Sequence, residues 1–335
     1  MLEPRLILEQ AASDGVFSGA VLHIEDLAAQ GPLGAWAVGR VAADPPGPTV
    51  GLDTLFDLAS LTKLFSVTAT LRLVDRGLLD LDESLRHLLD HRSGLPAWRP
   101  YFGSSEPVLA QALVEPRVHE PGARHVYSDV GFLHLLDRLQ QATGQGIAEI
   151  IQGEVLDPLG LRNTGYRGVG QGPPVALDAA VCATEICPRR GLLAGEVGDG
   201  NTWAMGGRST HAGLFAPAGD LALFARGWWS APATGFLSQE LRDAAWGDPA
   251  EPGTHVLGWD TVAAAPTVSS VGSKLSRRSR GHLGFTGTSL WIDPERAIAV
   301  ILLTNRVHPS REDNRIRGVR PRVHDAVADF VDSLR

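Results

Sequence analysis

The amino-acid sequence predicts an α+β fold, in which an antiparallel sheet flanked by helices carries an inserted, mostly helical lobe. Segments with strand character lie near both ends of the 335-residue chain, whereas the middle has mainly helical periodicity. We expect residues 1–60 and 252–335 to form the α/β lobe and residues 61–251 the helical lobe. Residue 60 then lies at the junction of the two lobes, where clefts tend to form.

The expected elements follow from apolar spacing and from turn signals along the chain. Helical spacing predicts helices at residues 4–12, 61–76 (with a helical pattern continuing to about 89), 108–113, 130–143, 147–156, 220–229 and 321–334. Asp220 is the expected N-cap of the helix at 220–229. The Asp-Pro-Leu-Gly run at 157–160 is expected to end the helix at 147–156. Strand-like runs occur at 16–24, 33–41, 255–262, 282–285, 289–293 and 297–304. Residues 171–207 are rich in Gly and Pro and are expected to have little regular structure.

Composition and charge restrict the class of protein. The apolar content of 44% and the charged content of 20% are ordinary for a soluble enzyme. A net charge of −8 with scattered arginines argues against a nucleic-acid partner. The first fifteen residues do not resemble a signal peptide, and the longest apolar run, at 297–303, is too short to span a bilayer. We therefore expect a cytoplasmic protein with no membrane span, and its oligomeric state stays open.

The sequence offers no recognisable metal or cofactor motif. No Cys-His cluster has zinc-site spacing, and no His-Glu-x-x-His occurs. Cys182 and Cys187 have four residues between them and are either a local disulfide or, as a cytoplasmic chain favours, two reduced thiols. We expect no metal and no cofactor.

Ser60 and Lys63 form a Ser-x-x-Lys pair at the start of the predicted helix 61–76. Residues three apart on a helix share a face, so the two side chains are expected to lie one turn apart. A serine hydroxyl becomes a good nucleophile when a base takes its proton, and a neutral amine can be that base. The ordinary interpretation of such a pair is a helix cap followed by a solvated lysine.

The scarcity of lysine favours the catalytic interpretation. Only two of the 30 basic residues, Lys63 and Lys274, are lysines, and the rest are arginines. Arginine does not give up its proton in proteins, whereas the pKa of a buried lysine shifts readily. A lysine inside an apolar helix therefore indicates a site that needs an amine, whereas Lys274 lies in a serine- and arginine-rich segment and is expected to be a solvated loop residue.

Two further segments are candidates for chemistry. Tyr127-Ser128-Asp129 enters the predicted helix 130–143, where a tyrosine is presented to a cleft or packs as a partly buried aromatic. His282 lies on a late strand and, taken alone, is an unremarkable strand-end histidine. Their order along the chain, after Ser60 and Lys63, gives both residues their interest.

Taken together, these segments resemble the serine β-lactamase and penicillin-binding protein superfamily, and most closely its class C-like esterase and D,D-peptidase branch. The resemblance is carried by the phrases FDLASLTK at 56–63, LLDHRSGLP at 88–96 and GHLGFTGT at 281–288, with Tyr127-Ser128-Asp129 between them. It implies a β-lactamase/transpeptidase-like fold, made of an α/β lobe from both chain ends and a helical lobe from the middle.

The resemblance also implies roles for individual residues. Ser60 is the nucleophile that accepts the acyl group, Lys63 is its partner, and Tyr127 helps to carry the proton to and from the leaving group. His282 stands where most members have the Lys of Lys-Thr-Gly, in a substrate and oxyanion segment that includes Gly284. The backbone N–H groups of Ser60 and Phe285 are the expected oxyanion hole, and either neutral Lys63 or the Tyr127 phenolate is the acylation base.

The sequence departs from the superfamily pattern at three places. Leu283 replaces the usual Thr and so removes a hydroxyl that helps to hold a substrate carboxylate. Asp129 replaces the commoner Asn and so replaces a side-chain donor by an acceptor near Lys63. The connection from Leu81 to His91 is short, which affects the rim of the site. The first two changes favour ester cleavage over the recognition of β-lactams or D-Ala-D-Ala peptides.

Several neighbours of these motifs have weaker assignments. Trp98 and Tyr101 either line the cleft mouth or pack inside the fold, and His91 is expected to be a structural loop residue. Asn305 and Arg306 are expected either at the surface or against an anionic group of the substrate. The segment 206–213, which contains His211, is expected to border the site on the strength of the resemblance.

The function expected from the sequence is a serine hydrolase that forms an acyl-enzyme at Ser60 on a small-molecule ester, amide or β-lactam. The alternative is a non-catalytic penicillin-binding-like binder or sensor that keeps the fold and the cleft. The presence of Ser60, Lys63 and Tyr127 favours the enzyme. An α/β-hydrolase is disfavoured because no Gly-x-Ser-x-Gly occurs.

Overall fold

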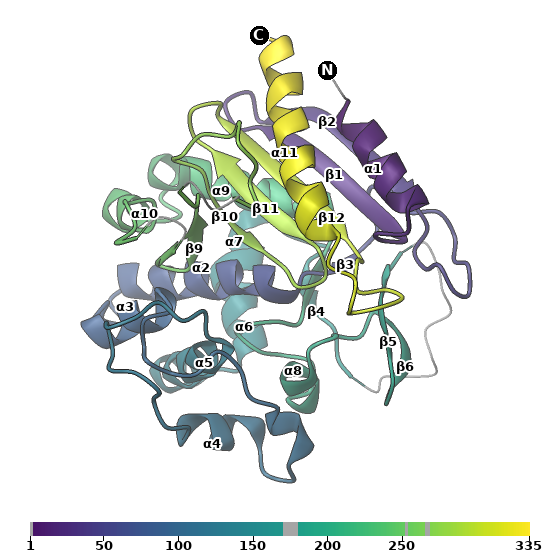
Figure 1. Cartoon of the computed structure of the whole chain (residues 1–335). Coiled ribbons are helices and arrows are strands. Elements are labelled where there is room, and N and C mark those ends of the chain that lie inside the picture. The colour runs from purple at the N-terminus through teal and green to yellow at the C-terminus, as the bar shows by residue number, and fades with distance from the viewer. Residues whose placement is uncertain (1–2, 170–179, 252–253, 265–268) are drawn as a thin grey trace.

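The computed structural model describes residues 3–169, 180–251, 254–264 and 269–335, and it is built around a seven-stranded antiparallel sheet (Figure 1). Its strands pair in the order β2 (Gly31–Gly39), β1 (Gly19–Asp26), β12 (Ile298–Thr304), β11 (Ser289–Asp293), β10 (Arg280–Leu283), β9 (Trp259–Thr261) and β8 (His255–Val256). Both chain ends therefore build one sheet, which confirms the predicted fold class.

The helices come from both ends and from the middle of the chain. They are α1 (Pro4–Ser13), α2 (Thr62–Asp75), α3 (Glu83–Leu89), α4 (Val108–Leu113), α5 (Asp129–Thr143), α6 (Ile147–Ile151), α7 (Asp157–Leu159), α8 (Gly200–Ala204), α9 (Ala218–Thr234), α10 (Gln239–Ala245) and α11 (Ile316–Ser333). Two small sheets accompany them: β3 (Phe56–Asp57), β7 (Leu214–Ala216) and β4 (Gly165–Tyr166) form one, and β5 (Ala183–Cys187) and β6 (Gly191–Ala194) form the other. No helix in the described ranges is both long enough and apolar enough to cross a bilayer.

The central strand β12 is buried on both faces, as its continuous apolar run predicts. Successive side chains of a strand point to opposite faces, so Val300 and Leu302 pack with α1 and α11, whereas Ile301 and Leu303 pack with α2 and α9. Figure 1 shows α1 and α11 together across one face of the sheet. Full burial of one such aliphatic side chain contributes about 1.5–3 kcal/mol. The sheet therefore joins two separate cores.

Three predicted elements differ from the structure for local reasons. The strand expected at 255–262 is instead the hairpin β8–β9, because Leu257 and Gly258 adopt positive φ values of 41° and 80°. The helical pattern of 61–89 divides at Gly77, which has a φ of 69° at the end of α2. Asp220 is not an N-cap, because α9 begins after Pro217 and the Asp220 carboxylate accepts hydrogen bonds from Asn163 and Thr164.

The Gly- and Pro-rich segment is only partly covered by the described residues. Residues 171–179 of the predicted irregular stretch lie outside them, and the remainder contains β5, β6 and the short helix α8. Helix α9, from the middle of the chain, packs against β1 and β12. The division into two lobes at residues 60 and 252 therefore stays a prediction. No disulfide joins Cys182 and Cys187.

A tight turn between β3 and α2 sets the position of Ser60. Ala59 has a φ of 47°, which costs a residue with a side chain of the order of 1–3 kcal/mol. The Asp57 carboxylate supports this turn by accepting a hydrogen bond from the Ala59 N–H at 2.9 Å, and it accepts a second from the Gly198 N–H at 2.9 Å. Burial raises the pKa of Asp57 to about 6. The carboxylate that holds the turn is therefore poorly solvated.

The shifted pKa of Asp57 predicts a pH dependence of stability. Because the folded-state pKa of about 6 lies above the ordinary value of 3.8, the folded state holds this proton more tightly than the unfolded state. The contribution of Asp57 to the free energy of unfolding is fully present below its ordinary pKa of 3.8 and is lost as the pH rises through about 6. We expect the melting temperature of the wild type, relative to that of Asp57→Asn, to fall between pH 4 and pH 7 and to level off above. Calorimetry across this range, with the exposed Asp53→Asn as control, checks the prediction, and a difference that stays constant or grows with pH contradicts it.

Candidate active site

Ser60 and Lys63 lie one turn apart at the start of α2. Ser60 belongs to a short 3₁₀ turn, Ala59–Leu61, that leads into the helix. The Lys63 ammonium donates a hydrogen bond to the Ser60 hydroxyl oxygen at 3.1 Å, and the Lys63 side chain is fully buried. The structure therefore places an amine against the predicted nucleophile, inside the fold rather than in solvent.

The Lys63 ammonium has three hydrogen-bond acceptors. Besides Ser60, it donates to the Asp129 carboxylate at 2.6 Å and to the carbonyl oxygen of His211 at 3.3 Å. Burial acts to lower the pKa of Lys63, but attraction to Asp129 and to Tyr127 prevails, and the pKa stands above its ordinary value. Lys63 is therefore charged in the resting site, and Asp129 is the counter-ion.

Tyr127 lies over Lys63 because of the way α5 begins. The ammonium nitrogen of Lys63 is 4.8 Å from the centroid of the Tyr127 ring. Ser128 caps α5 by accepting from the Gly131 N–H at 2.9 Å, and its hydroxyl donates to the Pro96 carbonyl at 2.7 Å. The cap fixes the residue on each side of it, so Tyr127 and Asp129 reach the same ammonium.

The resting charge of the site follows from these contacts. Burial raises the pKa of Tyr127, and the opposing effect of the Lys63 charge does not overcome it. The phenol is therefore neutral while Lys63 carries a proton. Neither of the two acylation bases considered from the sequence, neutral Lys63 or the Tyr127 phenolate, is the resting form of its residue.

The segment after β10 is bound to the backbone just before Ser60. Thr286 and Thr288 donate their hydroxyls to the carbonyl oxygens of Asp57 and Leu58, at 2.7 and 3.2 Å. A Cβ at Gly284 would lie 2.7 Å from the Leu58 oxygen, so only glycine permits this approach. The predicted oxyanion residue Phe285 is thereby held in the turn that follows Gly284, beside the Ser60 turn.

Arg320 is a residue of this site that the sequence reasoning missed. It is buried on α11, and its guanidinium donates to the carbonyl oxygens of Gly284, Gly287 and Thr288 at 2.8–3.1 Å. The available signal was an arginine on the apolar face of the helix, one turn after Ile316 and three before Val323. Arg320 thus stabilises the turn that contains Phe285.

His282 lies on β10 with its ring 5.9 Å from that of Tyr127, measured between centroids. Its Nδ1–H donates to the Leu283 carbonyl at 2.8 Å, which leaves the lone pair on Nε2. Burial lowers the pKa of His282 to about 3, so the ring is neutral. Leu283 has no polar side-chain group, and its side chain packs with the core under α1 and α11.

A group of histidines surrounds Tyr127, which the sequence did not predict. The ring centroid of His91 is 4.4 Å from that of Tyr127, and the ring centroid of His255 is 5.5 Å from it. One nitrogen from each of His91, His255 and His282 lies within 4.8 Å of the others, which makes them a possible metal-binding group among the described residues. The His91 loop and the β8 hairpin are far apart in sequence, so no local spacing indicated the group.

The segment 206–213 does border the site, since the His211 carbonyl contacts Lys63. The His211 ring lies between the Ser209 hydroxyl at 2.8 Å and the Asp199 carboxylate at 3.0 Å. This is the residue set of a catalytic triad, but Ser209 is fully buried. These contacts therefore stabilise the segment, and Ser209 is not a candidate nucleophile.

The weaker assignments resolve mostly toward structure. Asn305 and Arg306 are neither at the surface nor free to meet a substrate, because both are buried and bonded to backbone groups. Tyr101 is buried and donates its hydroxyl to Glu115, whereas Trp98 is 44% exposed. Lys274 pairs with Asp329 at a half-exposed position.

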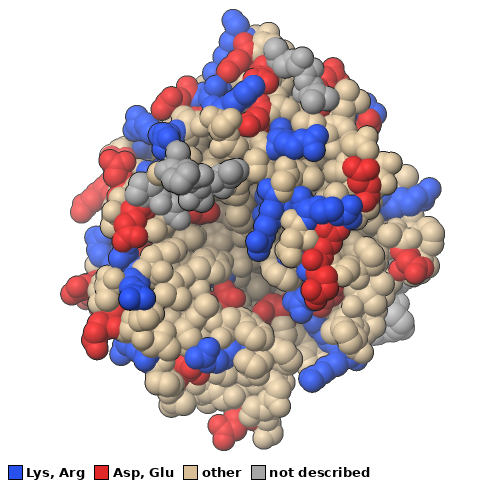
Figure 2. All heavy atoms as spheres, viewed as in Figure 1, with Lys and Arg blue, Asp and Glu red and all other residues tan. Residues whose placement is uncertain are grey.

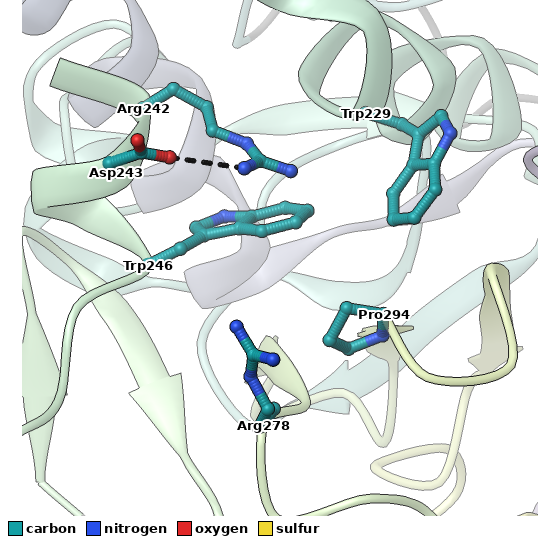
Figure 3. Close-up of a pocket in the computed structure, with 6 residues that line it drawn as sticks. All are labelled: Trp229, Arg242, Asp243, Trp246, Arg278 and Pro294. Atoms are coloured by element: carbon teal, nitrogen blue, oxygen red, sulfur yellow. Dashed lines mark hydrogen bonds and ion pairs between the residues drawn. The ribbon is translucent and has the colours of Figure 1, made fainter. Parts of the chain in front are cut away.

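The surface is hollowed close to the site. Figure 2 shows a hollow near the centre of this face, in the region where Figure 1 places α2 below the sheet. A separate cavity of about 350 Å³ lies among Trp229, Arg242, Asp243, Trp246, Arg278 and Pro294 (Figure 3). Arg242 stacks on Trp246 there, with 4.2 Å between the guanidinium carbon and the ring centroid. None of the predicted site residues lines that cavity.

Comparisons with known proteins agree with the fold and with the family resemblance. The family model described as Beta-lactamase matches residues 28–322. A protein of Escherichia coli O157:H7, provisionally named D-alanyl-D-alanine carboxypeptidase, is 28% identical over 79% of this chain and 72% of its own. A similar relative of Salmonella typhi is 27% identical over 76% of this chain and 70% of its own.

Solved structures share the fold along nearly the whole chain. The D-amino acid amidase of Ochrobactrum anthropi SV3 superposes with a TM-score of 0.74 at 21% identity, covering 99% of both chains. A beta-lactamase of Mycobacterium bovis gives a TM-score of 0.64 at 22% identity, covering 97% of this chain and 99% of its own. EstCE1, a hydrolase with promiscuous acyltransferase activity, gives 0.72 at 23% identity over 97% of each chain. With its family model matched over most of its length, the chain belongs to the beta-lactamase family.

Proposed function

We propose that this protein is a serine hydrolase that forms an acyl-enzyme at Ser60 on carboxylic esters or small amides. The observation that carries the proposal is the buried Lys63 ammonium, 3.1 Å from the Ser60 hydroxyl and under the ring of Tyr127. Relatives and structural neighbours named as carboxypeptidase, amidase and hydrolase support the same chemistry. No cofactor takes part in the proposed reaction.

In the proposed reaction, Ser60 Oγ attacks the substrate carbonyl as its proton passes to a base. The backbone N–H groups of Ser60 and Phe285 stabilise the oxyanion, and each such donor typically contributes about 3 kcal/mol. Tyr127 delivers a proton to the leaving group, and water then hydrolyses the acyl-enzyme. His282 and Gly284 border the substrate beside the oxyanion turn.

The resting charges suggest how the base forms. Lys63 becomes an acceptor once its proton moves 2.6 Å to Asp129, which leaves a neutral amine and a neutral carboxylic acid. The amine then takes the proton of Ser60, so that Asp129 is the final acceptor during acylation. The carboxyl group returns the proton through Lys63 and Tyr127 to the leaving group, and the protons balance.

The alternative function is a non-catalytic binder or sensor with the same cleft. Intact-mass measurements after exposure to a fluorophosphonate and to a penicillin separate the two. A covalent adduct mapped to Ser60, absent in Ser60→Ala, supports the enzyme. Absence of any adduct with both reagents supports the binder.

Esters are expected to be better substrates than β-lactams. Asp129 is engaged by Lys63 and offers no N–H to an acyl-amide carbonyl, and Leu283 offers no hydroxyl to a substrate carboxylate. An ester needs fewer such contacts. We expect kcat/KM for short p-nitrophenyl esters to exceed that for penicillins and cephalosporins, compared under one set of conditions. A β-lactam rate well above the ester rate contradicts this.

Lys63→Arg is expected to lower kcat by at least ~100-fold, the usual effect of losing a general base. Arginine keeps the charge but not the ability to release a proton, because its pKa stays above ~12. Lys63→Met keeps the stem without the amine and is expected to be about equally inactive, with slow acylation. Circular dichroism controls for folding. Near-native turnover of Lys63→Arg would show that Lys63 is only a structural cation.

Chelation is expected to leave ester turnover intact, because the proposed route uses only side chains and backbone N–H groups of the chain and no metal. The measurement is kcat before and after dialysis against EDTA, with the metal content of both samples determined. Loss of activity on chelation that returns with added zinc would mean that the proposed chemistry is wrong.

A further inference from the structure

We propose that the histidines around Tyr127 form a binding site for Zn²⁺ or a similar divalent transition metal, and that occupancy inhibits the enzyme reversibly. The group is made of His91, His255 and His282, with one nitrogen of each within 4.8 Å of the others. Imidazole nitrogens without carboxylates favour zinc, copper or nickel over magnesium or calcium.

The first observation is that two of these rings present buried nitrogens with no partner. His282 Nε2 and His91 Nε2 are both inaccessible to solvent and make no hydrogen bond within the described part of the chain. Buried polar nitrogens are usually satisfied, so each requires an explanation. Two such atoms in one group of histidines are accounted for if an ion, with its water, occupies the space between them.

His282 has the arrangement of a metal ligand. Its Nδ1–H donates to the Leu283 carbonyl at 2.8 Å, which fixes the tautomer and directs the Nε2 lone pair away from that bond. Metal-binding histidines almost always have their second nitrogen held in this way.

His255 has an equivalent support. Its Nδ1 lies 3.0 Å from Nε2 of His125, and the two rings are stacked with their centroids 5.2 Å apart. When His255 Nδ1 donates its proton to His125, the lone pair of His255 is on Nε2. His125 is thus the orienting partner of a second ligand rather than a ligand itself.

His91 has a different role because of its backbone contact. Its Nδ1 accepts the Ser128 N–H at 3.0 Å, so the neutral ring carries its proton on Nε2. That Nε2–H is a donor and not a lone pair. We therefore assign His255 and His282 as ligands and His91 as the donor to a water or hydroxide on the ion.

The inhibitory consequence rests on the proposed function, whereas binding does not. A dication on His282 would lie beside Tyr127, whose ring is 5.9 Å from that of His282 and 4.8 Å from the Lys63 ammonium. It would add positive charge next to Lys63 and occupy a residue that borders the substrate. Both effects slow acylation.

Binding is tested on Ser60→Ala, so that the result does not depend on turnover. Metal-free protein is titrated with Co²⁺, whose visible absorption bands report histidine coordination, and with Zn²⁺ by calorimetry. In Ser60→Ala we expect one ion per chain. Relative to that protein, Ser60→Ala/His255→Gln is expected to bind the ion at least ~10-fold more weakly. His125→Gln in the same background removes the orienting partner and is expected to weaken binding ~10–100-fold. His119→Gln, outside the group, is expected to leave binding unchanged. No cobalt spectrum, or equal affinity in all four proteins, overturns the site.

Inhibition is tested on the wild type with a p-nitrophenyl ester. Each protein is compared with its own metal-free rate, and we expect Zn²⁺ to lower turnover reversibly in the wild type and far less in His125→Gln. Inhibition of equal strength in both, or tight binding without inhibition, overturns the inhibitory role. Absence of ester turnover in metal-free wild type would instead contradict the proposed function and leave the binding result standing.

Discussion

The Lys63 ammonium is the interaction on which the site depends. A buried charge costs several kcal/mol unless it is paired and hydrogen-bonded, and Lys63 satisfies this condition completely. Its three N–H donors have three acceptors: the hydroxyl of Ser60, the carboxylate of Asp129 and the carbonyl of His211. These acceptors come from the start of α2, the first turn of α5 and the segment before β7. One cation therefore joins three separate parts of the chain at Ser60.

The same pairing affects the proposed chemistry. A neutral amide at position 129 would share the ammonium without taking its proton, whereas the Asp129 carboxylate is both a counter-ion and an acceptor within 2.6 Å. The carboxylate holds Lys63 charged at rest, which opposes its use as a base. It also offers the proton a destination inside the site. In the proposed reaction, the departure from the asparagine of the superfamily pattern therefore pairs Lys63 with a carboxylate at rest and provides an acceptor for its proton.

The sequence predicted what depends on local pattern. The buried run of β12, the amphipathic α1 and the Ser-x-x-Lys turn are all encoded within a few residues. It failed where backbone conformation or a distant partner decides. The positive φ at Leu257 and Gly258 converts one strand into a hairpin, and the contact of Asp220 with Asn163 and Thr164 withdraws it from capping. Such effects leave no periodic pattern of apolar residues in the sequence, so the sequence did not predict them.

The site shows the same division between local and distant information. Motif order placed Ser60, Lys63 and Tyr127 in one neighbourhood, but Arg320 and the histidines reach it from α11, from the loop after α3 and from the β8 hairpin. Each of these is an ordinary residue in its own segment. Only the sheet, which places β8 and β10 on either side of β9, and the start of α5 bring the histidines around Tyr127.

The presence of a lysine at position 63, in a chain that has arginine at almost every other basic position, can be understood from the same contacts. Arginine is a sufficient cation at the surface, where its planar donors find water or carboxylates in many arrangements. At position 63 the three acceptors surround a single nitrogen, at 2.6–3.3 Å, in a space without solvent access. A guanidinium has five donors spread over a plane, so at least two of them would lack acceptors there. The geometry around Ser60 therefore requires a compact, tetrahedral donor, and this requirement keeps a lysine in a chain that otherwise uses arginine almost throughout.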